Sequence, residues 1–349
     1  MAPWALGISS YLHEYGGVFV TDLSIVIVNW NVVGLLRRCL SSIVGELRPE
    51  PGLDLVLPGT SWSYEIWVVD NASTDGSAEM VREEFPYVHL IANSENLGFT
   101  VANNQAIAKS NGKYVLLLNC DTEVVGDALV TMVAYMEEHS DVGVLGPQLR
   151  YPDGDIQSSR RRFPTMAIAY LESTILQQWF PDNSILRRYY IVDVPDDAIQ
   201  EVDWVVGACL MTRREIVDQV GLLDEGFFMY SEELDWCYRI KQAGWKVVYL
   251  PAAVIIHYEG RSSAQVVPAR HIYFQSSKVR FFRKHCGMAS GELLRVFLLA
   301  TYAFQLCEEA AKWLLGHKKE LRAERVRAYW QVLRSGLTGR RRDVPAKRA

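Results

Sequence analysis

The chain has 349 residues, of which 49% are hydrophobic and 22% charged, which excludes a disordered or fibrous protein and allows one large domain or two ordinary ones. The net charge of −5 indicates no nucleic-acid partner. The charge is uneven, because residues 317–349 hold eleven Lys or Arg against three Asp or Glu, a local +8 that leaves −13 elsewhere. This basic end predicts contact with anionic lipid or another polyanion, or else a solvated terminus.

Strand and helix patterns alternate in the first 140 residues. Continuous apolar runs predict strands at 23–28, 64–69, 88–92 and 114–118, and helical spacing predicts helices at 33–44, 77–85, 99–110 and 128–139. Residues 50–63 are rich in Pro and Gly and predict a loop. This alternation is typical of a parallel sheet covered by helices on both faces.

The pattern loosens after residue 146. Residues 151–195 mix basic, aromatic and polar side chains and predict a partly helical insertion over the sheet. Later runs predict a strand at 202–212, a helix at 213–220, and strands at 245–250 and 254–257.

Residues 293–316 form the one candidate membrane segment of the sequence. Arg295, Glu308, Glu309 and Lys312 interrupt it, so a spanning helix would bury several charges at high cost. Two alternatives stay open: an amphipathic helix lying in the membrane interface, or a helix packed on the protein body.

The six cysteines include no CxxC pair and lie mostly in apolar patterns, which predicts reduced, buried thiols in a cytosolic protein. Residues 1–22 hold neither a basic start nor a clean apolar core. We therefore interpret them as an N-terminal extension and not as a signal peptide.

Polar residues interrupt two of the predicted strands at their carboxyl ends. The apolar strand in KYVLLLNCDTEV (113–124) leads directly into Asp121. Ligands of open α/β sheets bind beyond these strand ends, so Asp121 is a candidate for contact with a metal or a phosphate. Asp is also a favoured helix N-cap, and the two interpretations are about equally supported by this segment alone.

The second predicted strand ends at Asp70, followed by the small polar loop NASTDGS. Asp70 can accept hydrogen bonds from a base or ribose, and the loop amides can face phosphates. An ordinary turn with Asp and Asn side-chain hydrogen bonds is the alternative. Gly98 opens the helix predicted at 99–110, either for close approach to a ligand or as a loop glycine without a role. The chain contains no GxGxxG and no GxxxxGK[ST] motif, which argues against dehydrogenases and P-loop proteins.

The segment FFMYSEELDWCYR (227–239) crowds three carboxylates among aromatic residues. Ser231 could simply cap a helix with acidic residues in its first turn. Carboxylates next to apolar groups also have raised pKa values, which suits a general base. His257 ends a strand in VIIHYEG, where a histidine is either structural or, together with Asp121, a metal ligand.

The ordered set of motifs resembles the family-2 glycosyltransferases, and within them the rhamnosyltransferase-like members. The matching segments are SIVIVNWN (24–31), VVDNASTDGS (68–77), NLGFTVANNQAI (96–107), LLLNCDTEV (116–124), VVGACLMTRREI (205–216), GLLDEGFFMYSEELDWCYRIKQAGWKVVYLP (221–251) and IHYEGRSS (256–263). Each motif is weak alone, but seven in family order are highly specific.

The resemblance implies an α/β GT-A fold, with a mixed, mainly parallel sheet flanked by helices and with helices at the C-terminal end. It implies a nucleotide-sugar half at 23–125 and an acceptor half at 126–285, between the extension at 1–22 and the helices and basic tail at 286–349. The reaction is transfer of a sugar with inversion from a nucleotide diphosphate sugar. A carboxylate deprotonates the acceptor, and Mg²⁺ or Mn²⁺ stabilises the leaving diphosphate.

Carried over by position, the resemblance assigns the metal to Asp121 and His257, and the base to Glu233, with Glu232 as the other candidate. Asp235 would orient the base or the acceptor. It assigns donor binding to eight residues: Asn29, Asn31, Asp70, Asn71, Asn96, Gly98, Asn103 and Asn119. Two residues depart from the family pattern. Asn119 replaces the first Asp of the DxD motif and supplies no charge, and Glu233 replaces the usual Asp.

The leading hypothesis is an inverting, metal-dependent hexosyltransferase, peripheral at the cytoplasmic face of the cell membrane. It would move a sugar from dTDP-rhamnose or a UDP-sugar to a glycan or lipid-linked acceptor in cell-surface polysaccharide synthesis. A nucleotidyltransferase is one alternative, but residues 23–34 lack a basic motif for a triphosphate, and Arg37 and Arg38 are the nearest cations. A non-catalytic nucleotide-sugar-binding protein is the other, and the candidate catalytic residues argue against it.

Overall fold

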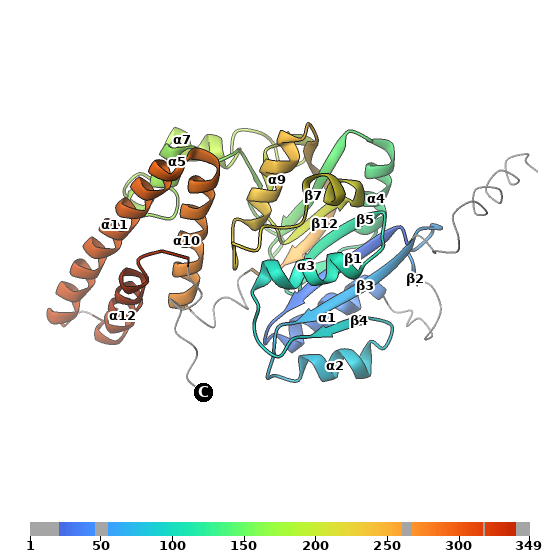
Figure 1. Ribbon diagram of the computed structural model, residues 1–349, viewed down its shortest axis with the longest axis horizontal. Coiled ribbons are helices and arrows are strands. Elements are labelled where there is room, and N and C mark those ends of the chain that lie inside the picture. Colours follow the sequence, from blue (N-terminus) through green and yellow to red (C-terminus); the bar gives the residue numbers. More distant parts are fainter. Residues whose placement is uncertain (1–20, 46–54, 260–266, 317, 340–349) are drawn as a thin grey trace, which may run out of the picture.

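The first predicted strand, β1 (Leu23–Asn29), lies inside the sheet, and all seven of its residues are buried. A strand covered on both faces needs apolar side chains at successive positions, which explains its continuous run of Ile and Val. The computed structural model describes residues 21–45, 55–259, 267–316 and 318–339, and Figure 1 shows their arrangement.

A ten-stranded sheet forms the centre of the molecule. Its order is β2 (Leu55–Val56), β3 (Ser63–Asp70), β1, β5 (Tyr114–Asn119), β11 (Cys209–Arg213), β7 (Val142–Arg150), β12 (Lys246–His257) and β6 (Thr122–Val124), with β4 (His89–Ala92) beside β3 and β9 (Gln200–Val202) beside β12. The pairs β1–β3, β1–β5, β3–β4 and β7–β12 are parallel, whereas β11 runs antiparallel to both of its neighbours. A short ladder joins β8 (Arg160–Arg161) to β10 (Trp204–Val205).

Helices cover both faces of this sheet, as the alternating pattern predicts. On one face α1 (Val33–Val44), α2 (Ser77–Glu84) and α4 (Ala128–Glu138) pack on side chains that include Ile25 and Ile27 of β1. On the other, α3 (Phe99–Lys109), α8 (Arg214–Val220) and α9 (Glu232–Gln242) pack on side chains that include Val26 and Val28. Alternate residues of one strand thus serve two separate cores.

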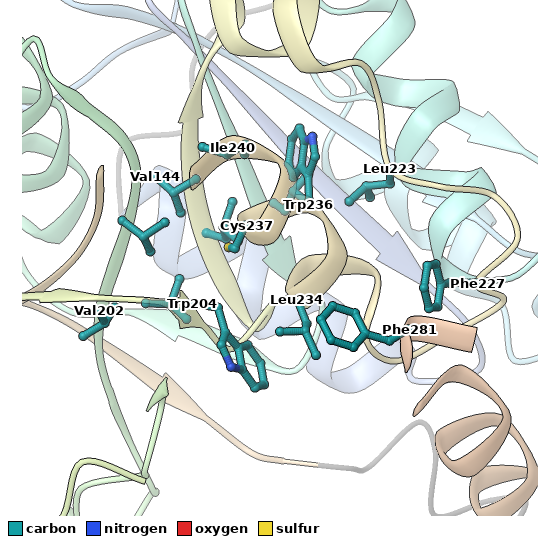
Figure 2. Close-up of a cluster of buried hydrophobic side chains, with 14 of the residues drawn as sticks. Val144, Val202, Trp204, Leu223, Phe227, Leu234, Trp236, Cys237, Ile240 and Phe281 are labelled. Carbon is teal, nitrogen blue, oxygen red and sulfur yellow. The ribbon is translucent and has the colours of Figure 1, made fainter. Parts of the chain in front are cut away.

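The C-terminal helices lie beside the sheet body (Figure 1). They are α10 (Val267–Cys286), α11 (Met288–Leu314) and α12 (Lys319–Ser335), next to α5 (Met166–Leu171), α6 (Ile175–Trp179) and α7 (Ser184–Tyr189) of the predicted insertion. Figure 2 shows Phe281 of α10 pointing toward Leu234 of α9, and Phe227 belongs to the same hydrophobic core. The helix α10 therefore packs both on the sheet body and on α11 and α12, and the division at residue 286 stays a prediction.

Several expected boundaries were wrong. The strand β7 was not predicted, because Gly143, Gly146 and Pro147 interrupt its apolar run. The runs at 245–250 and 254–257 form one strand, β12, with an irregularity between Leu250 and Val254. The single strand predicted at 202–212 is broken into β9, β10 and β11, and the loop predicted at 50–63 contains β2.

The predictions about the cysteines and about a membrane-spanning helix can be tested in the residues that the structure describes. Cys39, Cys120, Cys209 and Cys237 are buried thiols as predicted, but Cys286 and Cys307 are exposed. Within the described ranges no helix is both long enough and apolar enough to cross a bilayer. Residues 1–20, most of the predicted extension, lie outside the described part.

Candidate functional site

The carboxyl ends of β3, β1 and β5 bring three of the predicted polar residues to one edge of the sheet. Asn29 lies opposite Asp70, and Asn119 lies opposite Val28. The Asn29 Nδ2 group donates to Asp70 Oδ1 at 2.9 Å, and the Ser73 N–H donates to Asp70 Oδ2 at 2.9 Å. Both oxygens of this buried carboxylate therefore accept protein hydrogen bonds that fix the start of the loop after β3.

Asn31 and Asn71 hold this loop from two sides. Asn31 Oδ1 accepts the Thr74 N–H at 2.7 Å, and Asn31 itself has a φ of 54°, which Asn tolerates better than most residues. Asn71 Nδ2 donates to the Gly98 carbonyl at 3.1 Å. The predicted donor-binding residues of the first and second strands thus form one hydrogen-bonded unit.

Gly98 is required by a neighbouring segment of the protein. Its φ is 90°, and a Cβ placed there would lie 2.7 Å from the Phe228 carbonyl oxygen. The next residue, Phe99, donates its N–H to that same oxygen at 2.9 Å. Gly98 therefore allows close approach to the backbone of Phe228, in the segment that precedes Glu232 and Glu233, where the sequence suggested close approach to a ligand.

Two predicted donor-binding residues have hydrogen bonds within this same region. Asn96 Oδ1 accepts the Gly98 N–H at 2.9 Å. Asn103 is buried inside α3 and donates to the Phe99 carbonyl at 2.8 Å. Asn96 supports the turn before α3 and Asn103 bonds within the first turns of α3, and their predicted donor contacts stay predictions.

Asp121 does not cap a helix. The strand β6 follows it at Thr122, and the next helix, α4, begins only at Ala128. Antiparallel pairing places His257 opposite Thr122, and the His257 Nε2 atom lies 3.4 Å from Asp121 Oδ1. Both side chains are buried. The tertiary structure thus brings together the two predicted metal ligands, which are far apart in the sequence.

Gln157 fixes the orientation of the His257 ring. Its Nε2 donates to the His257 carbonyl at 2.7 Å, and its Oε1 lies 2.9 Å from His257 Nδ1. A carbonyl oxygen can only accept, so the amide orientation is determined and Oε1 must accept a hydrogen from Nδ1. The neutral ring then directs the lone pair of Nε2 toward the Asp121 carboxylate, an arrangement that needs a cation or a proton between the two atoms.

The donor set is small but suits a divalent cation. Ligands at adjacent positions around a cation with bonds of about 2.1 Å are roughly 3.0 Å apart, close to the 3.4 Å seen here. In the part of the chain that the structure describes, no group of three or more His, Cys, Asp or Glu could hold a metal. The Asn119 Oδ1 atom is buried and has no hydrogen-bond partner among the described residues.

A strained turn presents Glu232 and Glu233. Tyr230 and Ser231 have φ angles of 68° and 64°, a left-handed conformation that costs about 1–3 kcal/mol per residue and clusters at functional sites. Ser231 occupies the N-cap position of α9, but its side chain makes no capping hydrogen bond in the described structure. Ser231 therefore holds the cap position, with acidic residues in the first turn as the capping alternative expects, but it does not cap through its side chain, and the strained turn is the kind found at functional sites.

The two glutamates differ in their surroundings. Burial raises the pKa of Glu232 well above its ordinary value, and the charge of Glu233 raises that pKa further. Burial also raises the pKa of Glu233, although backbone N–H groups, including that of Gly207, hydrogen-bond its carboxylate and oppose the rise. Glu233 lines a pocket between α9, α10 and α5, and its Oε2 lacks a partner among the described residues.

Asp235 faces a different set of neighbours. Its fully buried carboxylate pairs with Arg239 at 2.9 Å, with Lys284 at 2.7 Å and with His285 at 2.7 Å. Burial would raise the pKa of Asp235, but hydrogen bonds from Lys284, His285 and Arg239 outweigh it and lower that pKa. This carboxylate joins α9 to α10, and it is absent from the described lining of the pocket at Glu233.

The sequence model of the family described as Glycosyl transferase family 2 matches residues 24–221, more than half of the chain. The chain belongs to glycosyl transferase family 2. A relative, the N-acetylglucosaminyl-diphospho-decaprenol L-rhamnosyltransferase of Mycobacterium tuberculosis (strain ATCC 25618 / H37Rv), is 28% identical over 256 residues, which cover 68% of this chain and 82% of the relative. The rhamnosyltransferase WbbL of Escherichia coli (strain K12) is 28% identical over 180 residues, which cover 46% of this chain and 61% of that protein.

A crystal structure of GalNAc-T7 with UDP, GalNAc and Mn²⁺ shares the fold, with a TM-score of 0.52 at 16% identity over 76% of this chain and 48% of that chain. The predicted GT-A fold is therefore confirmed. This family-2 protein is a nucleotide-sugar glycosyltransferase of polysaccharide synthesis, as the motifs predicted. The nucleotidyltransferase and the non-catalytic binding protein are thereby excluded.

Some residues of this site were missed in the sequence. Gln157 follows β7 in a polar segment without periodicity, so no local pattern indicates its contact with His257. Gly207 lies inside the quoted motif at 205–216, and a Cβ there would lie 3.3 Å from Glu233 Cβ. A glycine within an apolar strand run often marks a place where another segment packs closely against the backbone. Gly207 could have been identified as a site residue on that ground.

Proposed function

We propose that this glycosyltransferase transfers a hexose with inversion from a nucleotide diphosphate sugar, with dTDP-rhamnose the first candidate and UDP-sugars the next. The acceptor is a glycan or a lipid-linked sugar. The names of two relatives, both rhamnosyltransferases, support the choice of donor. The observation that carries the proposal is the buried Asp121–His257 pair beside the in-register ends of β1, β3 and β5.

The carboxyl ends of β3, β1 and β5 would hold the nucleotide sugar. Asp70 and Asn29 fix the loop at 71–76, whose amides and the following N-terminus of α2 suit an anionic group. Asn119 Oδ1, buried without a described partner, is available to accept a hydroxyl hydrogen of the donor.

Asp121 and His257 would hold Mg²⁺ or Mn²⁺, and the diphosphate oxygens would complete its coordination. The cation would neutralise the charge that develops on the leaving diphosphate. Asn119 contributes no charge, so His257 matters more here than in a site with two aspartates. Gln157 holds the His257 ring in the tautomer that leaves Nε2 free to coordinate.

Glu233 would act as the general base. Glu233 belongs to the described lining of the pocket and Glu232 does not, so Glu233 is the one of the two placed to take the proton of an acceptor hydroxyl. Glu232 would remain protonated beside it, because burial and the neighbouring charge of Glu233 both raise the pKa of Glu232. The Gly207 N–H keeps the Glu233 carboxylate in place.

The test is the metal-dependent hydrolysis of a panel of dTDP-, UDP- and GDP-sugars by the wild type and by Asp121→Ala. We expect hydrolysis of one donor class with Mn²⁺ or Mg²⁺ and its loss in Asp121→Ala. Asp141→Ala is the matched control, because Asp141 pairs with Lys246 on the surface. Undiminished turnover by Asp121→Ala would refute the metal role.

We also propose that the enzyme lies peripherally on an anionic membrane through α11. Leu293, Val296, Phe304 and Leu314 expose more than half of their surface along this helix, and Trp179 of α6 contacts Phe304. Basic residues of α12 and the tail add positive charge for anionic headgroups.

Sedimentation with vesicles tests this contact. We expect the wild type to bind phosphatidylglycerol vesicles more strongly than phosphatidylcholine vesicles, and Phe304→Ser with Leu314→Ser to lose binding while keeping donor hydrolysis. Equal recovery of this double variant and the wild type on the anionic vesicles would overturn the assignment.

A further inference from the structure

A pocket opens next to the candidate base, on the side of α9 that faces α10 and the segment 151–195. Its aromatic lining includes Tyr189, Trp204, Tyr230 and Phe274. Figure 2 shows Trp204, Leu234 and Phe281, three of its lining residues, grouped at the start of α9. Glu233 reaches the same pocket, so a molecule bound there lies within reach of its carboxylate.

A largely buried ion pair lies in the wall of the pocket. Lys278 Nζ is 3.1 Å from Glu172 Oε2 and donates to the Glu172 carbonyl at 2.8 Å. The Tyr189 hydroxyl donates to Glu172 Oε1 at 3.2 Å, and Lys278 Nζ lies 5.0 Å from the centre of the Phe274 ring. An ammonium group has three hydrogens, and the Glu172 carbonyl accepts one of them while the Glu172 carboxylate lies at ion-pair distance, so hydrogen-bonding capacity remains for a ligand.

The charge and shape of the pocket select a chemical class. The Glu172–Lys278 pair is neutral overall, and Glu233 supplies the only other charge in its described lining. A phosphate would therefore add negative charge beside Glu233 while the charge of Lys278 is already balanced by Glu172, which is unfavourable. Aromatic walls with few oriented polar groups fit the apolar ring faces and the hydroxyls of a neutral sugar.

We propose that this pocket binds the acceptor, a neutral sugar whose reactive hydroxyl lies at Glu233 and whose neighbouring hydroxyl is held by Lys278 and Glu172. This inference rests on the proposed function and adds the acceptor class and its subsite. In the transfer step the acceptor oxygen bonds to the anomeric carbon as the bond to the diphosphate breaks. The hydroxyl proton goes to Glu233, and the electron pair leaves with the nucleoside diphosphate.

The location of the pocket also separates acceptor from donor recognition. Glu172 and Tyr189 belong to the segment 151–195, and Phe274 and Lys278 belong to α10. The predicted donor residues come instead from the ends of β1, β3 and β5, from the loops after β1 and β3, and from the turn before α3 and α3 itself. A change in the Glu172–Lys278 pair should therefore alter the KM for the acceptor without altering hydrolysis of the donor.

The experiment uses the full chain with the donor found in the hydrolysis panel. The acceptor probes are p-nitrophenyl glycosides of neutral sugars, with the matching sugar 1-phosphates as charged competitors. The principal variant is Lys278→Met with Glu172→Gln, which removes both charges at once and leaves no unpaired ion buried. The matched control is Lys246→Met with Asp141→Asn, which removes an exposed ion pair between β12 and the start of β7.

We expect the acceptor KM of the principal variant to rise by about 10- to 100-fold, the loss typical of a hydrogen bond to a charged group. Donor hydrolysis should stay within about twofold of wild type. Acceptor binding without turnover, followed by saturation-transfer NMR, should weaken in parallel, and circular dichroism should confirm an unchanged fold.

Three results would overturn the inference: an unchanged acceptor KM, a parallel fall in donor hydrolysis, or tighter binding of the sugar phosphates than of the neutral glycosides. Failure of the proposed function would give a different result: the wild type would hydrolyse no nucleotide sugar in the panel.

Discussion

Gln157 gives the sharpest test of the metal site, because it contacts His257 at two atoms and touches neither candidate substrate. In Gln157→Leu the Nδ1–H group and the carbonyl of His257 both lose their partner. The ring is then free to adopt the other tautomer, in which Nε2 carries a hydrogen and cannot coordinate. Removing such a supporting hydrogen bond typically costs about 10- to 100-fold in metal affinity, or roughly 1.4–2.8 kcal/mol.

The assay is a titration with Mn²⁺ in the presence of UDP, in which electron paramagnetic resonance measures free Mn²⁺. The ¹⁵N shifts of the His257 ring provide a second readout that does not depend on turnover. We expect weaker Mn²⁺ binding and a changed tautomer signature in Gln157→Leu. Two unpaired buried groups should also lower the free energy of unfolding, by about 1–3 kcal/mol for each group.

Gln148→Leu is the matched control. Gln148 is a buried glutamine of the same sheet that donates to Asp196 and Tyr249 and does not contact His257. It should lose comparable stability but keep its affinity for Mn²⁺. Wild-type Mn²⁺ affinity in Gln157→Leu, or equal losses in both variants, would refute the reasoning.

Three further predictions concern the helix start at α9 and the turn that contacts it. Glu233→Gln should bind the donor but lose transfer by about 100-fold or more, as expected for a general base; an active Glu233→Gln beside an inactive Glu232→Gln would reverse the assignment. Burial raises the pKa of Glu232 above its ordinary value of 4.5. Above pH 4.5 the native state therefore keeps a proton that the unfolded chain releases, and the free energy of unfolding falls as the pH rises through the raised pKa. Urea unfolding should therefore show Glu232→Gln gaining stability relative to wild type between pH 4 and pH 7, and a constant difference would contradict this. Gly98→Ala should lower stability by about 1–3 kcal/mol in thermal melts, because φ is positive there and the new Cβ would meet Phe228; an unchanged melting temperature would show that this contact yields easily.

Local physics explains which parts of the fold were predictable. Strand β1 is buried on both faces, so its apolar run is readable without any neighbour. The polar residues at the ends of β1, β3 and β5 were also readable, because parallel strands end at one edge of the sheet. The strand β7 was missed because the glycine and proline residues within it lower its local strand propensity. Pairing with neighbouring strands in the sheet outweighs that low propensity.

The family and the candidate site residues were thus determined by the sequence itself, because motif order and strand-end chemistry are local properties. Only the tertiary structure decided how these residues cooperate. His257 meets Gln157 across 100 positions of sequence, and Glu172 meets Lys278 across 106. Such pairs depend on how loops and helices close over the sheet, and no periodicity or motif along the chain encodes that closure.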